Sequence, residues 1–288
     1  MNDAFVKLHP FSGIIYFAAV IGFSMLFMNP VCILISLSCA ILNAALINGK
    51  RALVFTARFI LPMITAVVII NPVFNHRGAT IITYLPWNNP LTLESVIYGA
   101  AAAAMVASVM LWFSVFNTVM TSDKIICLFG RIIPSLSLVI SMTLRFVPRF
   151  ISQFKQLRAS RVNRNKASLK TLVRELSVMI SWALESAVES ADSMKSRGYG
   201  LKGRTSYNIF KFRKTDGTAL IFTLCISAAL IVFIILGTAK YSYFPMFKFD
   251  FSTITSVIFY ILYAGVMLLP AIISGWEGLK WKRLRSAI

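Results

Sequence analysis

The chain has 288 residues, of which 58% are hydrophobic and only 14% are charged, and its formal net charge at pH 7 is +19. Soluble domains carry roughly 25% charged residues, so this composition, with a mean hydropathy of +0.76, excludes a soluble fold. Lysine and arginine accumulate on the cytoplasmic side of membrane proteins. We therefore attribute the positive charge to a lipid membrane partner and expect no nucleic-acid binding.

Six stretches are apolar and long enough to cross a bilayer, which takes about 20 residues of helix. They are residues 11–28, 31–48, 53–74, 94–120, 218–237 and 253–274. Asn29-Pro30 alone joins the first two stretches, which predicts a tight helical hairpin. The first stretch lacks a signal-peptide cleavage pattern, so we expect it to remain as a membrane helix. Pro62 should kink the third.

Two charged residues lie close to the ends of predicted spans. Arg58 is near the start of the third span, where its long side chain can reach the interface, so we expect it to anchor the helix, with contact to a substrate as the alternative. Glu94 is expected to begin the fourth helix. Between these spans, the β-branched residues 80–83, flanked by Gly78 and Pro86, predict a small hairpin or re-entrant turn.

The charges at the span ends predict the orientation of the chain, because basic residues favour the cytoplasm. With six spans, one side receives Lys7, Lys50, Arg51, Lys124, Arg131, Lys211, Arg213, Lys214, Lys280, Lys282, Arg283 and Arg285. The other side receives only Arg77, Lys240 and Lys248. We therefore expect both termini to be cytoplasmic, in a multi-pass protein of a bacterial or archaeal cell (inner) membrane.

These features predict an all-α integral membrane protein with a cytoplasmic helical insert between spans 4 and 5. Its regions are 1–121 (four spans), 122–216 (the insert, which holds most of the basic residues) and 217–288 (two spans and a basic tail). Within the insert we expect a short amphipathic helix over 124–131, and then a long helix from Pro134 to about residue 160, kinked at Pro148. A third helix follows from Ser168 to about Ser196.

The third insert helix carries small residues at helical spacing. Ala183, Ala187 and Ala191 recur every fourth position, with Ser186 and Ser190 beside them. Such ladders allow two helix backbones to approach closely. The pattern is typical of a packed helix with a solvated acidic face, and it also fits a rigid crossing of two helices.

No motif in the chain indicates catalysis. The match of residues 198–203 to GxGxxG follows a helix and lacks the flanking strand of a dinucleotide site, so we read these glycines as a helix end. No histidine or aspartate lies inside a span, and the cysteines Cys32, Cys39, Cys127 and Cys225 form no CxxC pair. We therefore expect no enzyme activity, no cofactor and no metal site.

Three segments resemble the transmembrane T component of energy-coupling factor transporters, the family that includes the membrane subunit of cobalt uptake systems. Residues 189–200, with Ser196-Arg197-Gly198, look like the family's second Ala-Arg-Gly motif. Arg145-Phe146-Val147-Pro148 looks like its Arg-Phe-aliphatic-Pro stretch, and Asn71-Pro72 with the residues up to Gly78 resembles its pattern after the third helix. Ala159-Ser160-Arg161 corresponds to the first motif, with Arg158 as a rival arginine.

The resemblance implies a non-catalytic scaffold that works with two cytosolic ATP-binding-cassette ATPases and a substrate-binding membrane protein, the S component. In this family the motif arginines dock into grooves of the ATPases, which bind the ATP. ATP-driven closure then moves the insert and the S component, for uptake of vitamins or of cobalt or nickel ions. The apolar faces of the insert would hold the S component through Ile125, Leu128, Phe129, Leu136, Val139 and Met142.

Two other functions remain open from the residues alone. One is a stand-alone carrier or channel, or a membrane anchor for another cytosolic complex. The other is a lipid-processing enzyme, which the chain supports less well because its spans contain no nucleophile–base pair. The chain does not identify the substrate, the S component or whether the T component is shared, since substrate binds elsewhere in this family.

Overall fold

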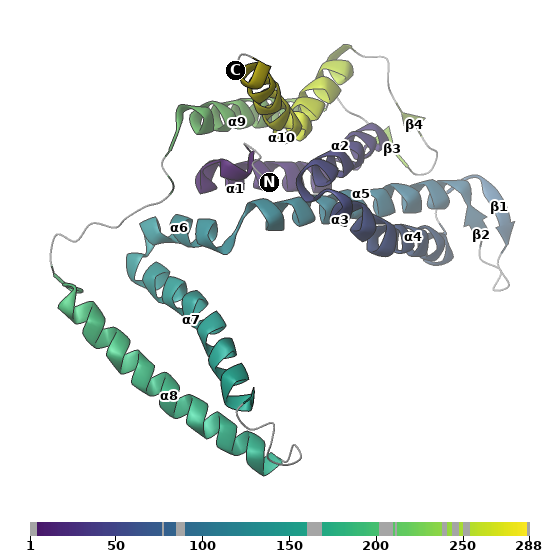
Figure 1. The fold of residues 1–288 in the computed structure, drawn as a ribbon. Coiled ribbons are helices and arrows are strands. Elements are labelled where there is room, and N and C mark those ends of the chain that lie inside the picture. The colour runs from purple at the N-terminus through teal and green to yellow at the C-terminus, as the bar shows by residue number, and fades with distance from the viewer. Residues whose placement is uncertain are drawn as a thin grey trace. The chain divides into compact units, whose positions relative to one another are not determined.

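The computed structural model describes residues 5–76, 78–84, 90–159, 169–201, 210, 212–237, 241–243, 248–249 and 254–286 (Figure 1). The chain divides into two compact units. The first unit comprises Met1–Lys124 and Lys211–Ile288, and the second comprises Ile125–Phe210. The described residues are mostly helical, and the chain is an all-α integral membrane protein as the composition predicts.

Helices of the first unit coincide with all six predicted spans. They are α1 (Pro10–Leu26), α2 (Pro30–Asn48), α3 (Lys50–Phe55), α4 (Leu61–Phe74), α5 (Leu93–Val119), α9 (Lys214–Ile235) and α10 (Ile254–Ser286), with a 3-10 turn η1 (Phe5–Lys7) and a π-helical turn η2 (Thr56–Ile60). Two short antiparallel strand pairs accompany them, β1 (Ile81–Tyr84) with β2 (Pro90–Thr92) and β3 (Tyr241–Ser242) with β4 (Lys248–Phe249).

Among the described residues, six helices are long and apolar enough to cross a membrane, but they differ from the predicted six in one member. Helix α1 has 17 residues, about 26 Å at 1.5 Å per residue, which is at the lower limit for a span. Ser135–Ala159, in the predicted insert, passes the length and composition test instead. It carries Arg145 and Arg149 near its middle, and arginines at the bilayer centre are costly. We therefore keep α1 as the first span.

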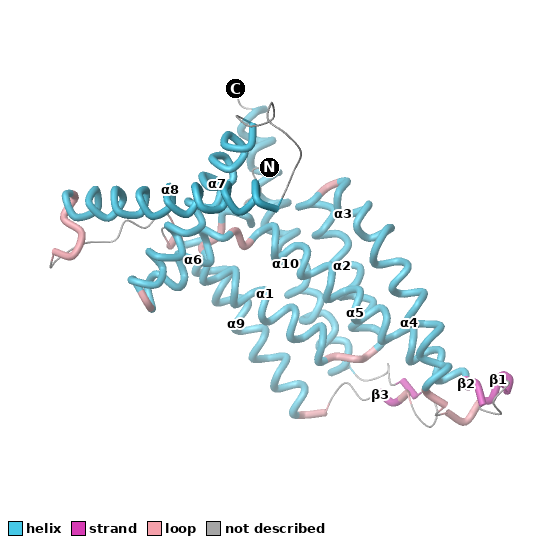
Figure 2. Tube along the Cα trace, turned by 90° about the horizontal axis from the view of Figure 1, so that it is seen from below, coloured by secondary structure: helices cyan, strands magenta, loops and turns pink. Residues whose placement is uncertain are grey.

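Helix α5 is the centre of the first unit and packs against α1, α2 and α4 (Figure 2). Its residues Gly99, Ala103 and Ala107 are buried, and a Cβ atom on Gly99 would lie 2.9 Å from the Cβ atom of Asn71 in α4. Small residues at this spacing let membrane helices approach closely, because their short side chains take up little space between the two backbones. The Ala-rich start of α5 therefore determines how closely α4 can pack.

Polar side chains join the helices inside this apolar unit. The Tyr16 hydroxyl donates a hydrogen bond to the Val266 carbonyl at 3.2 Å, and the Asn43 amide donates to the Met267 carbonyl at 3.2 Å. The indole N–H of Trp112, which is fully buried, lies 3.3 Å from the Ser36 hydroxyl. Each such bond satisfies a polar group that has no access to water. The bonds of Tyr16 and Asn43 hold α10 against α1 and α2.

The third predicted span is not one continuous α-helix. The π-helical turn η2 separates α3 from α4 and ends just before Pro62, which lies in the first turn of α4. Proline has no N–H to donate to the regular hydrogen-bond pattern of an α-helix. A π turn is one of the ways in which a helix accommodates a missing hydrogen bond. The Thr56 hydroxyl donates to the Ala52 carbonyl at 2.9 Å beside this turn. Pro62 thus accompanies an irregular turn at the place where the sequence predicts a kink.

The predicted hairpin between the third and fourth spans is confirmed. Strands β1 and β2 pair with Ile81 opposite Thr92 and Tyr84 opposite Pro90, with an irregular register between Ile81 and Thr83. Glu94 lies in the first turn of α5 and is buried, and its carboxylate accepts hydrogen bonds from the backbone N–H and the hydroxyl of Thr80. Glu94 therefore closes the hairpin onto the helix start, which agrees with the structural role expected for it.

The second unit is a pair of long helices that follow a shorter one. Helix α6 (Ser122–Ile132) leads from the first unit into the second, and α7 (Pro134–Ala159) and α8 (Leu169–Ser196) follow. The Ser137 hydroxyl donates to the Ile126 carbonyl at 3.2 Å, which holds the start of α7 against α6. Helices α7 and α8 pack against each other within this unit. The three helices expected in the insert are therefore present.

Candidate functional site

Helix α8 ends in a Schellman motif that places Arg197 at the last position of the helix. The backbone N–H of Tyr199 bonds to the Met194 carbonyl at 3.0 Å, and that of Gly198 bonds to the Lys195 carbonyl at 3.0 Å. Gly198 has φ +80°, the left-handed conformation that this motif requires and that glycine adopts without strain. The helix end predicted at residues 198–200 is confirmed, whereas Gly203 lies outside the described residues.

The side chain of Arg197 is exposed at this helix end. Within the described part of the chain it has no hydrogen bond or ion pair, while the neighbouring Ser196 hydroxyl donates to the Ser193 carbonyl at 2.9 Å. Its guanidinium group therefore keeps all five donors available for a partner. A helix end stiffened by the Schellman motif presents these donors from a defined backbone position.

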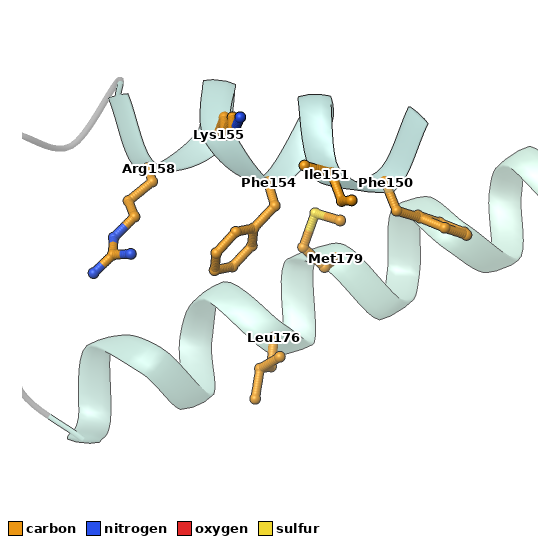
Figure 3. A pocket seen from close by; sticks show the side chains of 7 residues that line it. All are labelled: Phe150, Ile151, Phe154, Lys155, Arg158, Leu176 and Met179. Atoms are coloured by element: carbon orange, nitrogen blue, oxygen red, sulfur yellow. The ribbon is translucent and has the colours of Figure 1, made fainter. Parts of the chain in front are cut away.

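The first predicted motif lies only partly inside the described residues. Ala159 is the last residue of α7 and is exposed, whereas Ser160 and Arg161 lie outside the described residues. The rival arginine, Arg158, is exposed in the last turn of α7. Arg158 also lines the recess between α7 and α8 (Figure 3).

This recess, which we call the α7–α8 recess, has a volume of about 490 Å³. Figure 3 shows Phe154 directed toward α8 and Arg158 next to it at the end of α7. The residues around it are Phe150, Ile151, Phe154, Lys155, Arg158, Leu176 and Met179. Its lining is therefore apolar, with two cations toward the end of α7.

Aromatic contacts fix the pairing of α7 with α8. The rings of Phe150 and Trp182 lie edge to face with centroids 5.3 Å apart, and the Arg149 guanidinium carbon lies 5.9 Å from the centroid of the Trp182 ring. Pairs of this kind contribute about 0.5–1.5 kcal/mol beyond their buried area. Trp182 is thus the residue of α8 that holds α7 at this level.

The small-residue ladder does not make this contact. Ala187 and Ala191 are exposed, while Ser186 is buried and its carbonyl accepts a hydrogen bond from the Ser190 hydroxyl at 2.6 Å. The side of α8 that meets α7 carries Trp182 and Met179. Two of the three ladder alanines, Ala187 and Ala191, are thus open on the surface of the second unit, whereas Ala183 is half-buried; the acidic side chains Glu185 and Glu189 are exposed.

The residues predicted to hold a membrane partner lie on α6 and α7. Leu136 and Val139 are 46% and 57% exposed, and Met142, Ile125 and Leu128 are half-buried. The side chain of Phe129 lies outside the described residues. Contiguous exposed apolar surface on a folded protein indicates a protein or membrane contact. Leu136 and Val139 therefore have apolar area open to a partner, and their contact with a membrane protein stays a prediction.

Sequence reasoning missed a polar junction at the two ends of the insert, which we call the Asp216 junction. The Asp216 carboxylate in the first turn of α9 accepts hydrogen bonds from the backbone N–H of Arg213 at 2.8 Å and from that of His9 at 3.2 Å. The Ser12 hydroxyl donates to the Asp216 carbonyl at 3.2 Å. The signal available in the sequence was an acidic residue at the third position of a helix, the pattern of a capping box.

Lys124 belongs to the same junction. It is buried, and its ammonium group donates to the Val6 carbonyl at 2.5 Å. Burial lowers the pKa of Lys124 below its ordinary value, and the Asp216 carboxylate opposes part of that shift. Lys124, near the start of the insert, and Asp216, at its end, both bond to the N-terminal segment over residues 6–12.

Comparison with known proteins places the chain among transport proteins. Over 110 residues it is 29% identical to the energy-coupling factor transporter transmembrane protein EcfT of Lactobacillus helveticus (strain DPC 4571), covering 35% of this chain and 40% of that protein. Over 121 residues it is 30% identical to the uncharacterized protein MG181 homolog of Mycoplasma pneumoniae (strain ATCC 29342 / M129 / Subtype 1), covering 36% of this chain and 28% of that protein. Both alignments span less than half of the relative's length.

A family model gives the broader match. The model described as CbiQ, cobalt transport protein, matches residues 8–207, from the residues before α1 to beyond the end of α8. The match therefore includes Arg197 with its Schellman motif, the α7–α8 recess, and the first spans. Since it covers well over half of the sequence, the chain belongs to the CbiQ cobalt transport protein family.

Proposed function

We propose that the chain is the T component of an energy-coupling factor importer, which transmits the ATP-driven motion of two cytosolic ATPases to a membrane-embedded S component. The exposed Arg197 at the rigid end of α8 is the observation that carries the proposal. Its fork of donors suits bidentate pairing with a carboxylate in an ATPase groove. Family membership and the similarity to the EcfT protein support the same function.

The ATPase contact in this proposal uses both ends of the helix pair. Arg197, Ser196 and Gly198 form the contact at the end of α8, and Ala159, Ser160 and Arg161 form the contact beyond α7. Arg158 is the alternative first arginine, because it is exposed in the last turn of α7 and lines the α7–α8 recess. Substituting Arg158 and Arg161 separately by alanine and measuring ATPase binding decides between them.

The S component in this proposal contacts the exposed apolar residues of α6 and α7. Leu136 and Val139 supply the most open apolar area among the residues we assign to it. A hydrophobic membrane protein can bury this area, which favours association at about 25 cal/mol per Å². The substrate, a vitamin or a transition-metal ion, then binds to the S component and not to this chain.

The Asp216 junction has a part in this mechanism. A scaffold that transmits force must resist bending where its moving insert joins the membrane helices. The bonds of Asp216 to His9 and Arg213 and of Lys124 to Val6 fasten those joints. We propose that the junction prevents local bending at these joints, so that movement of the insert is transmitted to the membrane helices.

The chain itself needs no cofactor and performs no catalysis in this proposal, because ATP is bound and hydrolysed by the partner ATPases. In this proposal the termini and the insert lie in the cytoplasm of a bacterial or archaeal cell, and the positive-inside bias supports that orientation. Labelling a single cysteine introduced at Ser286 with a membrane-impermeant reagent tests this orientation, since intact cells should protect it.

Affinity purification of the tagged chain from its own membranes tests the function. The proposal predicts two ATP-binding-cassette ATPases and one small hydrophobic protein in the purified complex, and no transport by the chain alone in vesicles. The alternative, a stand-alone carrier, predicts transport after reconstitution without partners. A partner-free chain that transports a solute would overturn the proposal in favour of that alternative.

A further inference from the structure

A recess on the first unit combines cations with open apolar side chains at the start of the third span. Its volume is about 350 Å³, and Lys50, Val54, Phe55, Arg58 and Phe59 line it. We call it the Lys50–Arg58 recess. All five residues belong to α3 or to the π-helical turn η2. The family assignment makes no use of this recess, and it lies in a different unit from α7 and α8.

The π-helical turn helps to bring the two cations together. In a regular α-helix, Lys50 and Arg58 would be separated by roughly 80° around the helix axis. A π turn contains more residues than an α turn, so Arg58, which lies inside η2, is rotated back toward the face that carries Lys50. Both side chains are exposed. The irregular turn next to Pro62 thereby helps to place both cations, which we call the cationic cluster, along the lining of one recess.

No acidic side chain neutralises this cluster within the described part of the chain. Neither Lys50 nor Arg58 has an ion pair there. Two cations without a counter-ion attract an anion, and the guanidinium and ammonium groups together offer donors to several oxygens of one phosphate. The recess therefore selects for an anionic ligand.

The other residues of the recess indicate that this ligand has an apolar part. Val54 and Phe59 are each 61% exposed, and the rings of Phe55 and Phe59 lie with centroids 5.5 Å apart. Exposed aliphatic and aromatic side chains next to two cations are complementary to an amphipathic molecule. A small inorganic anion would leave this apolar area uncovered.

The position along the span agrees with the depth of a lipid headgroup. The apolar span begins at Thr56, so Lys50 lies about 9 Å before it at 1.5 Å per residue. The headgroup region extends about 5–8 Å beyond each side of the hydrocarbon core, so the Lys50 backbone lies just outside it and the long side chain can reach back into it. Arg58 lies just inside the span and can extend its side chain outward to the same level. Val54 and Phe59 then face the upper part of the acyl chains.

From this geometry we propose that the Lys50–Arg58 recess binds the phosphate of an anionic phospholipid, with the acyl chains against Val54 and Phe59. The proposal does not depend on the transport function. The bound lipid would fill the irregular turn at η2 and fix the start of α4. The site is specific for a headgroup of net negative charge that carries apolar chains, which distinguishes it from general attraction to a negatively charged surface.

The test measures lipid retained by the full-length protein. Wild-type chain and the double variant Lys50→Gln/Arg58→Gln are purified in detergent, titrated with phosphatidylglycerol, and analysed by native mass spectrometry. The matched control is Lys7→Gln/Lys214→Gln, which removes the same charge from exposed residues of the first unit. Circular dichroism verifies that all three proteins have equal helix content.

We expect the double variant to bind phosphatidylglycerol roughly thirtyfold more weakly than wild type, since each basic side chain near an anionic surface contributes about 1 kcal/mol, or roughly fivefold. The control should bind as wild type does. Equal binding by the double variant, or an equal loss in the control, would overturn the site. If the double variant does not fold, Phe59→Ser on its own should weaken phosphatidylglycerol binding, and unchanged binding by that variant overturns the proposal.

Two further arms identify the ligand. Phosphatidylcholine should bind wild type and the double variant equally, because its headgroup has no net charge, and inorganic phosphate should not displace phosphatidylglycerol. Displacement by inorganic phosphate would show a free-anion site and overturn the lipid assignment. Loss of a co-purifying protein from the double variant, with phosphatidylglycerol binding unchanged, would show a protein-binding site and overturn it equally.

Discussion

The backbone N–H of His9 donates a hydrogen bond of 3.2 Å to the Asp216 carboxylate, although 207 positions separate the two residues in sequence. Through this bond a side chain in the first turn of α9 accepts the backbone N–H of the residue that precedes α1, so the starts of the two helices are joined. The rings of His9 and Phe212 lie edge to face with centroids 5.2 Å apart, which strengthens the same contact. The segment that follows the insert is therefore held by the N-terminus of the chain.

Replacement of Asp216 by alanine should destabilise the first unit. The change removes the acceptor of the His9 and Arg213 N–H groups, whose bonds are part-buried, and each lost hydrogen bond costs about 0.5–1.5 kcal/mol. Thermal unfolding of the purified protein in detergent, followed by circular dichroism, should therefore shift to lower temperature. Asp192→Ala, at an exposed position of α8, is the control and should leave the transition unchanged. An unshifted transition in Asp216→Ala would show that these bonds contribute nothing.

Because of Lys124, the folding free energy of the protein should change with pH in the alkaline range. Its pKa in the folded state is below the ordinary value of 10.5 because it is buried. Between these two pKa values the unfolded chain binds more protons than the folded chain, so folding free energy becomes more favourable as pH rises. The stability of wild type relative to Lys124→Met should therefore increase as pH rises toward 10.5.

The same comparison with Lys195→Met, which removes an exposed ammonium group, should show no such trend. Chemical denaturation in detergent at a series of alkaline pH values measures both differences. A constant difference between wild type and Lys124→Met would contradict the depressed pKa of Lys124.

Gly99 should be intolerant of a side chain. An alanine Cβ at this position would lie 2.9 Å from the Cβ atom of Asn71, which forces α4 away from α5. Overpacking of this kind costs about 1–3 kcal/mol. Gly22→Ala in α1 is the matched control, because nothing lies within 4 Å of its added Cβ. The thermal unfolding temperature should be lower than that of wild type for Gly99→Ala and unchanged for Gly22→Ala. Equal unfolding temperatures of the two variants would refute the close approach of α4 and α5.

Gly198→Ala should loosen the end of α8. Its φ of +80° costs an alanine about 1–2 kcal/mol, and the added Cβ would lie 3.1 Å from Leu201. Hydrogen exchange of the amides of Gly198 and Tyr199, which close the Schellman motif, should become faster. Gly278→Ala in α10, where nothing lies within 4 Å of the added Cβ, should leave this exchange unaltered. Unchanged protection in Gly198→Ala would show that the helix end does not need glycine.

The membrane helices could be predicted because apolar length is a property of the local sequence. Each predicted span has a helix of the first unit at its place, and the hairpin before Glu94 followed from its β-branched residues. The insert helices were predicted with ends that agree within a few residues. Pro62 indicated an irregularity in the third span, but a proline does not specify whether a helix bends or forms a π turn. The sequence therefore does not reveal the cationic recess beside that turn, and it indicates for Arg58 an anchor or a substrate contact.

Contacts between distant segments could not be predicted in the same way. Nothing local to Asp216 indicates that it meets His9, since this pairing depends on the packing of α1 against α9. The alanine ladder of α8 did not identify the residues that contact α7 for the same reason. Small residues permit a close approach, but the larger Trp182 and Met179 determine where α7 lies. Arg197 could be located from its motif, and its exposure follows from its position at a helix end.

The most direct test of the proposed function is the binding of the ATPases by an Arg197→Ala variant. The tagged variant and a Lys195→Ala control, both altered at exposed positions near the end of α8, are purified from membranes, and co-purified ATPase is quantified against the tagged chain. Loss of a charge pair at such a contact typically costs about 2–5 kcal/mol. The account predicts at least a tenfold loss of ATPase from Arg197→Ala, with normal membrane insertion, and wild-type recovery from Lys195→Ala. Wild-type recovery of ATPase and wild-type uptake from Arg197→Ala would contradict it.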